Sequence, residues 1–251
     1  MAEVNYNEFK NTFTKLTRVH DTSIVFRDWL DYCIDQFLIN PDLKYFKYED
    51  YTEEEYGYFF ELFLSWVSGM DEKLESHSWY DLLGVYYEET VKSSSKASDM
   101  GQFFTPHHVV ETMTELTVTG GDSGSCYDPA GGSGRFCLAY HIRYPKALCF
   151  SHDLDEFACK MAVLNFLIHG VKGAVVRCNS ISGEFYQGWK VNEFPFSIME
   201  VDKMSDSLVF IGEKVPGLSI HGENETVTDC NSLECDDGVV KVGQSSLEDY
   251  L

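Results

Sequence analysis

The chain has few basic residues for its length. Its 251 residues include 19 Lys and Arg against 41 Asp and Glu, which gives a formal net charge of −22 at pH 7. Proteins that hold nucleic acid through its phosphates normally present a basic face. This balance disfavours DNA binding by the isolated chain and leaves three alternatives: a local basic patch, a partner that supplies the contacts, or no contact with nucleic acid.

Other common signals are missing as well. The eight cysteines form no Cys-x-x-Cys pair, so we expect reduced thiols rather than a disulfide framework or a structural zinc site. His107 and His108 make a poor ligand set, and we expect no metal. No apolar run is long enough to cross a bilayer, and the first ten residues lack the pattern of a secretion signal. We therefore expect a soluble, cytoplasmic protein with no membrane partner.

The first third of the chain has helical periodicity. Apolar residues recur every three to four positions over residues 8–39, 53–67 and 79–91. Asn40 and Pro41 should end the first of these runs. The polar stretch KSSSKASDM, residues 92–100, has no apolar periodicity and predicts a hinge. The expected N-terminal helical domain covers residues 1–98.

The pattern changes after residue 100. Thr105 is placed to cap a helix, and Pro106 suits its first turn. Further along, strands and helices alternate, which predicts a doubly wound α/β sheet within a second domain, residues 99–251, that ends in an acidic segment. The expected strands are a short strand that ends at CYDPA, residues 126–130, and two longer ones at 147–153 and 173–179. The expected helices between them are 135–144 and 156–170.

The ends of these three strands carry groups that suit a nucleoside. The first is followed by Asp128 and the loop Gly131–Gly134, in which the missing Cβ atoms let a ligand approach the backbone. The second delivers Asp153 or Asp155, either of which could accept both hydroxyls of a ribose. The third ends at Asn179, which could hydrogen-bond an adenine edge. In an open α/β sheet such strand ends meet at one edge. The alternative is that the glycine loop is a dinucleotide-type or purely structural turn.

Three segments carry a family resemblance: GQFFTP, DPAGGSGRF and HDLDEFACKMAVLNFLIHG. They resemble the S-adenosylmethionine half of the amino-adenine DNA methyltransferases, especially the modification subunits of type I restriction-modification systems. The likeness covers residues 80–183, including DLLGVYYEE upstream, and it implies a Rossmann-like methyltransferase fold with S-adenosylmethionine as cofactor. In this sequence Gly132 stands where the family usually has Cys, and Asn179 stands where it usually has Asp.

The resemblance also implies a role for each matching residue. Thr105 and Pro106 would cover the methionine end of the cofactor, Asp128 and the glycine loop would wrap its amino acid and sugar, and the acids after the second strand would include the ribose acceptor. Asn179 would receive the adenine amine through its carbonyl. The full set expected to bind the cofactor is Phe104, Thr105, Pro106, Asp128, Pro129, Ala130, Gly131, Gly132, Ser133, Gly134, Asp153, Leu154, Asp155, Asn179 and Ser180.

The catalytic motif of the family is absent. Its Asn or Asp followed by Pro-Pro and an aromatic accepts hydrogen bonds from the target amine and stacks on a flipped adenine. The best positional candidate in this chain is Asp202, after FPFSIMEV, without either proline or the aromatic. Fewer than fifty residues follow position 205, and they are acidic and rich in Gly, Ser, Asp and Glu, which does not suit a target-reading domain.

Two functions stay open on this basis. One is a methyltransferase that acts on adenine in DNA through an unusual site or with a partner chain. The alternative is a non-catalytic acidic binding module that retains the cofactor and docks onto a restriction-modification or other protein assembly. The residues expected to bind S-adenosylmethionine favour the first function, whereas the missing motif and the net charge favour the second.

Overall fold

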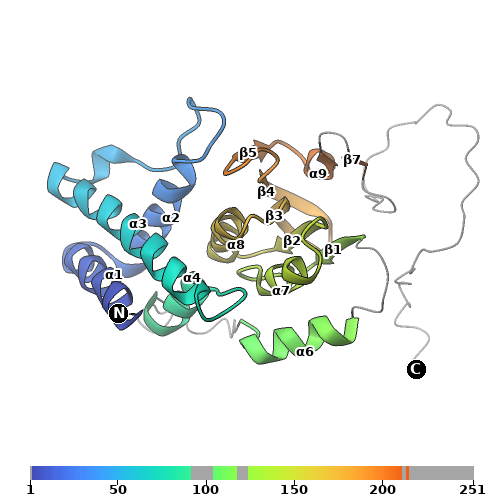
Figure 1. The fold of residues 1–251 in the computed structure, drawn as a ribbon. Helices are drawn as coiled ribbons and strands as arrows, with labels where there is room; N and C mark the ends of the chain where they lie inside the picture. The colour runs from blue at the N-terminus through green and yellow to red at the C-terminus, as the bar shows by residue number, and fades with distance from the viewer. Residues whose placement is uncertain (1, 92–103, 118–123, 211–212, 215–251) are drawn as a thin grey trace, which may run out of the picture.

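Figure 1 presents a computed structural model in which a helical unit lies beside an α/β unit. The structure describes residues 2–91, 104–117, 124–210 and 213–214. We use "helical unit" for residues 2–91 and "α/β unit" for the described residues from 104 onward. The expected hinge, the boundary after residue 98 and the acidic C-terminal segment lie outside the described residues.

The helical unit contains four α-helices and two short turns. They are α1 (Ala2–Thr17), α2 (Thr22–Asp35), the 3-10 turn η1 (Tyr48–Asp50), α3 (Glu53–Leu74), α4 (Leu82–Tyr86) and the π-helical turn η2 (Tyr87–Val91). The continuous helix expected over residues 8–39 is therefore two helices. Asp21 explains the break, because its carboxylate accepts hydrogen bonds from the N–H groups of Ser23 and Ile24 and so starts a new helix.

Helix α3 begins where the sequence predicts and ends later. Thr52 and Glu55 form a capping box at its start. The expected end near residue 67 is wrong, because Gly69 lies inside the helix. A Cβ atom on Gly69 would stand 3.0 Å from a methyl carbon of Leu82. This glycine therefore allows close packing of α3 on α4 rather than ending α3.

The α/β unit is a mixed five-stranded sheet with helices. Its elements are α6 (His107–Thr117), β1 (Ser125–Asp128), α7 (Arg135–Arg143), β2 (Leu148–Asp153), α8 (Glu156–His169), β3 (Gly173–Asn179), β4 (Glu184–Val191), β5 (Ile198–Val201), α9 (Met204–Ser207), and the two-residue pair β6 (Val209–Phe210) and β7 (Glu213–Lys214). The strand order is β1-β2-β3-β4-β5. The first three strands run parallel, whereas β4 is antiparallel to both β3 and β5.

The order of the described strands follows the chain from β1 to β5 and does not turn back at an inner strand, as the order of a doubly wound sheet does. The parallel strands advance steadily from β1 to β3, and α7 and α8, which connect them, contact each other on one face. Within the described residues β1 pairs with β2 alone, so it is an edge strand. The described part of the sheet is therefore mixed α/β.

Strand β4 was missed by the sequence analysis. It forms a hairpin with β3 through a turn in which Gly183 takes a φ of +76°. The signal lay in EFYQGWKV, which contains three aromatic residues, ends in a β-branched valine and follows directly after a Ser-Gly pair. Since this strand returns antiparallel, it moves the next segment, β5, to the far edge of the sheet.

A single apolar cluster runs through both units. It includes Trp29 and Trp66 of the helical unit, and Cys149, Phe166 and Trp189 of the α/β unit. Helix α2 packs against α8 along this junction. Burial of large side chains across the junction stabilises the folded state by about 25 cal/mol for each Å² of apolar surface removed from water. The two units therefore share a core.

None of the helices in the described ranges combines the length and the apolar character that crossing a membrane requires. Six cysteines lie in those ranges, and all six are buried free thiols.

Candidate functional site

The glycine loop leaves β1 in a tightly fixed conformation. Asp128 ends the strand, and its carboxylate accepts a hydrogen bond from the N–H of Ala130 at 3.1 Å. Gly132 and Gly134 have φ values of +55° and +88°, in the left-handed region where L side chains are strained. Gly134 then precedes the first residue of α7. Two of the loop glycines are therefore required by the backbone alone.

Neighbouring side chains also require the loop to be small. A Cβ atom on Gly131 would collide with the hydroxyl of Ser151, and one on Gly132 would lie 2.9 Å from the ring of Phe104. The loop is tied to β2 as well, because the N–H of Gly131 donates to the carbonyl of His152 at 2.9 Å. The loop is thus packed between β2 and Phe104.

A cavity of about 560 Å³ lies in front of this loop. Pockets for small molecules typically fall between about 300 and 1,000 Å³. Its walls come from the segment before α6, from α6 itself, from the glycine loop with the start of α7, and from the end of β2. The lining residues are Phe104, Thr105, Val110, Met113, Asp128, Ala130, Gly131, Gly132, Ser133, Arg135, Phe136 and Asp153.

The structure separates the predicted cofactor residues into two groups. Eight of the fifteen line the cavity: Phe104, Thr105, Asp128, Ala130, Gly131, Gly132, Ser133 and Asp153. The others, which do not line it, are Pro106, Pro129, Gly134, Leu154, Asp155, Asn179 and Ser180. Residues of three separate segments are thus brought together at one edge of the sheet.

The two acids after β2 have different surroundings. Asp153 lines the cavity, and its two carboxylate oxygens accept the N–H groups of Gly132 at 2.8 Å and Asp155 at 2.9 Å. Asp155 instead caps α8 by accepting the N–H of Ala158 at 2.8 Å. Burial raises the pKa of Asp155 and also that of Asp128. Of the two acids, Asp153 is the one that lines the cavity.

The end of β3 supports the loop from behind. The side-chain oxygen of Asn179 accepts the N–H groups of Ile181 and Ser182, so it closes its own turn. The hydroxyl of Ser180 donates to the carbonyl of Pro129 at 2.6 Å. These bonds hold the third strand end against the first loop, outside the cavity wall.

Helix α6 starts one residue later than the sequence predicts. Its first residue is His107, and the carbonyl of Pro106 accepts the N–H groups of Val109 and Val110. Thr105 lies before this turn and faces the cavity. Val110 is buried, while Met113 is 47% exposed although it lines the cavity. The apolar face of α6 is therefore partly a cavity wall rather than core.

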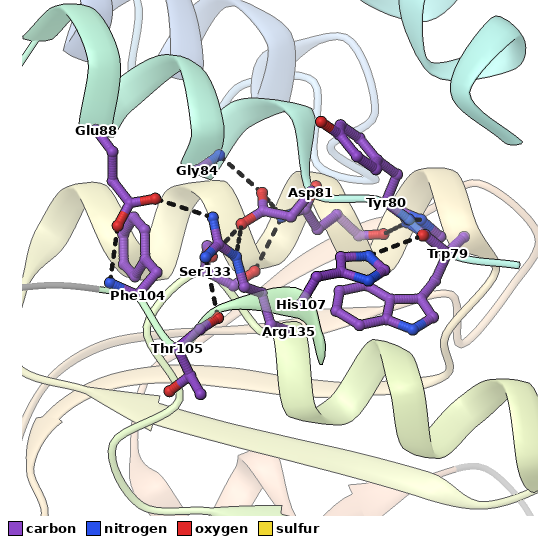
Figure 2. A network of polar contacts seen from close by, with 12 residues as sticks. Trp79, Tyr80, Asp81, Gly84, Glu88, Phe104, Thr105, His107, Ser133 and Arg135 are labelled. Carbon is purple, nitrogen blue, oxygen red and sulfur yellow. Dashed lines mark hydrogen bonds and ion pairs between the residues drawn. The ribbon is translucent and has the colours of Figure 1, made fainter. Parts of the chain in front are cut away.

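Figure 2 shows a buried polar network behind this wall. The carboxylate of Asp81, 1% exposed, accepts four hydrogen bonds. The donors are the N–H of Gly84 (2.7 Å), the side-chain amide of Asn165 (2.8 Å), the hydroxyl of Ser133 (2.5 Å) and the Nε of Arg135 (2.6 Å). A carboxylate offers about four lone-pair positions, so Asp81 is fully used.

Arg135 continues the network to the opposite wall of the cavity. Its Nη1 donates to the carbonyl of Thr105 at 3.1 Å, and its Nη2 donates to Glu88 at 3.2 Å. The other oxygen of Glu88 accepts the N–H of Phe104 at 3.0 Å, and the guanidinium lies 5.2 Å from the centre of the Phe104 ring. Asp81, Glu88 and Arg135 are not among the predicted site residues, although Asp81 and Glu88 lie within the segment DLLGVYYEE.

His107 is held by packing. Its ring stacks on Trp79 at 3.6 Å between centroids, and its Nε2 lies 3.2 Å from the Trp79 carbonyl, as Figure 2 also shows. Burial lowers the pKa of His107, so the neutral ring donates this bond at pH 7. The histidine therefore fixes the start of α6 to the helical unit.

Asp202 lies away from the cavity. It follows β5, at the opposite edge of the sheet from β1, and it is exposed. Adjacent strands are about 4.8 Å apart, so four strand intervals separate it from β1 by roughly 19 Å. The structure does not bring this acid to the residues that line the cavity.

Three buried thiols lie close together beneath the loop. The sulfur atoms of Cys126, Cys137 and Cys149 all lie within 4.8 Å of one another. Structural zinc takes four ligands, so this group supplies one fewer than such a site needs. The thiols fill the space between α7 and the first two strands.

Comparison with known proteins finds a matching family model and similar curated proteins. Residues 78–199 match the family model described as N-6 DNA Methylase. The Type I restriction enzyme HindI methylase subunit of Haemophilus influenzae is 30% identical over 100 residues. That match covers 36% of this chain and spans only 22% of the relative's length. No solved structure matches.

Proposed function

Because residues 78–199 make this chain a member of the N-6 DNA methylase family, we propose that the cavity at the ends of β1 and β2 binds S-adenosylmethionine. The observation that carries the proposal is that the glycine loop, Asp153 and the segment Phe104–Thr105, which are distant in sequence, line one cavity. The volume of this cavity suits a ligand of nucleoside size. The finer expectation of a doubly wound sheet is part of the same proposal and requires strands beyond those described.

Asp153 is the proposed acceptor for the ribose hydroxyls, in preference to Asp155. Each of its oxygens already receives one backbone N–H, which fixes the carboxylate and leaves a further lone pair on each oxygen. Asn179 and Ser180 are proposed to support the loop rather than to touch the ligand, because their side chains bond the local backbone.

The charges of the cavity suit a cationic ligand. Asp128 and Asp153 present carboxylates, and the one cation in the lining, Arg135, is already paired with Asp81 and Glu88. A sulfonium next to these carboxylates is favoured by Coulomb attraction in a partly desolvated site. When bound, S-adenosylmethionine supplies an activated methyl group, while the chain's own residues orient it and limit access of water.

We propose that the acceptor side of the reaction depends on a partner. Asp202 lies at the far edge of the sheet, and the net charge of −22 disfavours an unaided grip on DNA. The matched relative is by its name a methylase subunit, and the match spans 22% of its length. Methylation of adenine in DNA would then need a second chain. The position of Asp202 and the net charge also favour the alternative of a non-catalytic acidic module that acts within a protein assembly.

Calorimetric titration tests the cofactor proposal. We expect S-adenosylmethionine and S-adenosylhomocysteine to bind, and Asp153→Ala to weaken binding by about 10- to 100-fold, as expected for loss of one or two hydrogen bonds to a charged group. Asp202→Ala is the matched control, since it removes an exposed carboxylate outside the cavity and should leave affinity unchanged. Failure of the wild-type chain to bind either compound contradicts the proposal.

Methyl transfer distinguishes the two functions. Labelled S-adenosylmethionine is incubated with DNA and the chain, alone and with candidate partner subunits. Label in adenine only when a partner is present supports the partner-dependent enzyme. Cofactor binding without transfer under every condition supports the non-catalytic module.

A further inference from the structure

The wall of the cavity is anchored in the helical unit. Asp81 belongs to that unit, directly before α4, whereas three of its four donors belong to the α/β unit. Two of those donors, Ser133 and Arg135, line the cavity. The position of these two side chains is therefore set by a carboxylate that does not itself line the cavity.

The same anchor reaches the opposite wall. Arg135 holds the carbonyl of Thr105, and Glu88 of the helical unit holds the N–H of Phe104. Phe104 in turn packs on Gly132. The loop on one side and the segment Phe104–Thr105 on the other are thus fixed to one another through Arg135 and Glu88, as Figure 2 makes visible.

We infer that Asp81 is a positioning residue for the ligand cavity: it orients Ser133 and Arg135, so that the helical unit forms part of the binding site. The identity of the ligand rests on the proposed function. Asp81 acts through the residues that it holds, and its effect is on the shape of the cavity.

The chemistry of this position requires a carboxylate. Asp81 receives donors on both oxygens: Gly84 and Asn165 on one, Ser133 and Arg135 on the other. An Asn in its place would turn an NH₂ group toward one of these donor pairs and leave buried donors unpartnered. Asp81→Asn therefore keeps the size of the side chain while removing the charge that pairs with Arg135 and leaving one of the two donor pairs without an acceptor.

Asp31 provides a matched control. It is also a buried acid of the helical unit, and it pairs with Lys160 of α8 at 2.7 Å. Neither Asp31 nor Lys160 lines the cavity. Asp31→Asn thus disturbs the junction between the same two units without touching the cavity wall.

The experiment uses the full chain and two measurements. First, affinity for S-adenosylhomocysteine is measured by calorimetry at a temperature where every variant is folded. We expect Asp81→Asn to bind about tenfold or more weakly, equal to the loss of one well-placed polar contact, and Asp31→Asn to bind as the wild type does. Second, hydrogen exchange is measured without ligand. Asp81→Asn should speed exchange in peptides that cover residues 130–135 and 104–107, whereas Asp31→Asn should not.

The outcomes separate this inference from the proposed function. If the wild type binds and Asp81→Asn binds equally well, or if Asp31→Asn weakens binding to the same degree, Asp81 is merely structural and the inference is wrong. If the wild type binds neither cofactor compound, the proposed function fails, and the exchange measurement still decides whether Asp81 positions the loop. Should Asp81→Asn not fold, Ser133→Ala removes one of the four donors, keeps the ion pair, and should shift both measurements in the same direction by less.

Discussion

Asp81 and Asp31 both join the helical unit to the α/β unit, but their carboxylates are satisfied differently. Asp81 accepts four hydrogen bonds from four residues. Asp31 is matched by Lys160, which also pairs with Glu156 at 2.6 Å. Burial raises the pKa of Asp31 to about 6, and Lys160 opposes that rise only in part. Burying a charged carboxylate is costly unless its oxygens accept hydrogen bonds. The carboxylate of Asp81, next to the cavity, therefore has more complete hydrogen bonding than that of Asp31, away from it.

The largest expected difference is in stability. Asp81→Ala leaves Arg135 and three further donors without their acceptor, and removal of one partner from a buried pair costs about 3–5 kcal/mol. Asp31→Ala leaves Lys160 with Glu156 as a partner and removes a poorly satisfied charge, so its loss should be about 1–2 kcal/mol. Urea unfolding of both variants measures the two losses. Equal losses would contradict the contrast between the two acids.

The pH dependence of stability sharpens the contrast. The pKa of Asp31 rises from 3.8 to about 6 on folding, so between these values the folded chain holds a proton that the unfolded chain has lost. This group therefore lowers the free energy of unfolding as pH rises from about 4 to about 6, by about 3 kcal/mol at 1.36 kcal/mol per pH unit.

We expect the free energy of unfolding to fall by about 3 kcal/mol less in Asp31→Asn than in the wild type as pH rises from about 4 to about 6. Urea unfolding across this pH range measures the difference. In Lys160→Met the loss should extend to higher pH, because the lysine lowers the pKa of Asp31. Identical slopes in the wild type and Asp31→Asn would show that the acid is not shifted.

The smallest expected effect concerns two glycines of α3. Nothing lies within 4 Å of a Cβ atom built on Gly57, so Gly57→Ala should raise stability by about 0.5–1 kcal/mol through helix propensity. At Gly69 the new methyl meets Leu82, next to Asp81, at 3.0 Å. Gly69→Ala should gain nothing or lose stability. Thermal unfolding of the pair compares them, and an equal gain at both sites would mean that Leu82 moves freely.

Local patterns were enough to predict much of the α/β unit. The apolar runs of β2 and β3, the long apolar stretch of α8 with Gly170 after it, and the glycine loop after Asp128 are each specified by neighbouring residues. Because parallel strands end at one edge of a sheet, the meeting of the glycine loop and Asp153 followed from the same patterns. The roles given to Asn179 and Asp202 stay predictions.

Contacts between distant residues could not be predicted in this way. Arg135 and Asp81 are separated by 54 positions, and nothing in the local sequence of either residue indicates its partner. Likewise, EFYQGWKV is compatible with a strand, but its antiparallel return beside β3 depends on the turn at Gly183 and on sheet packing. These two features decide where Arg135 points and where Asp202 lies.

The position of β1 at the border of the described sheet affects how firmly the glycine loop is held. A four-residue outer strand frays more readily than an inner one. The loop, however, takes its support from the second strand: Gly131 bonds the backbone of His152, Gly132 bonds Asp153, and Ser151 closes the space beneath. Opening of the outer strand can therefore occur while the loop that it carries keeps its shape.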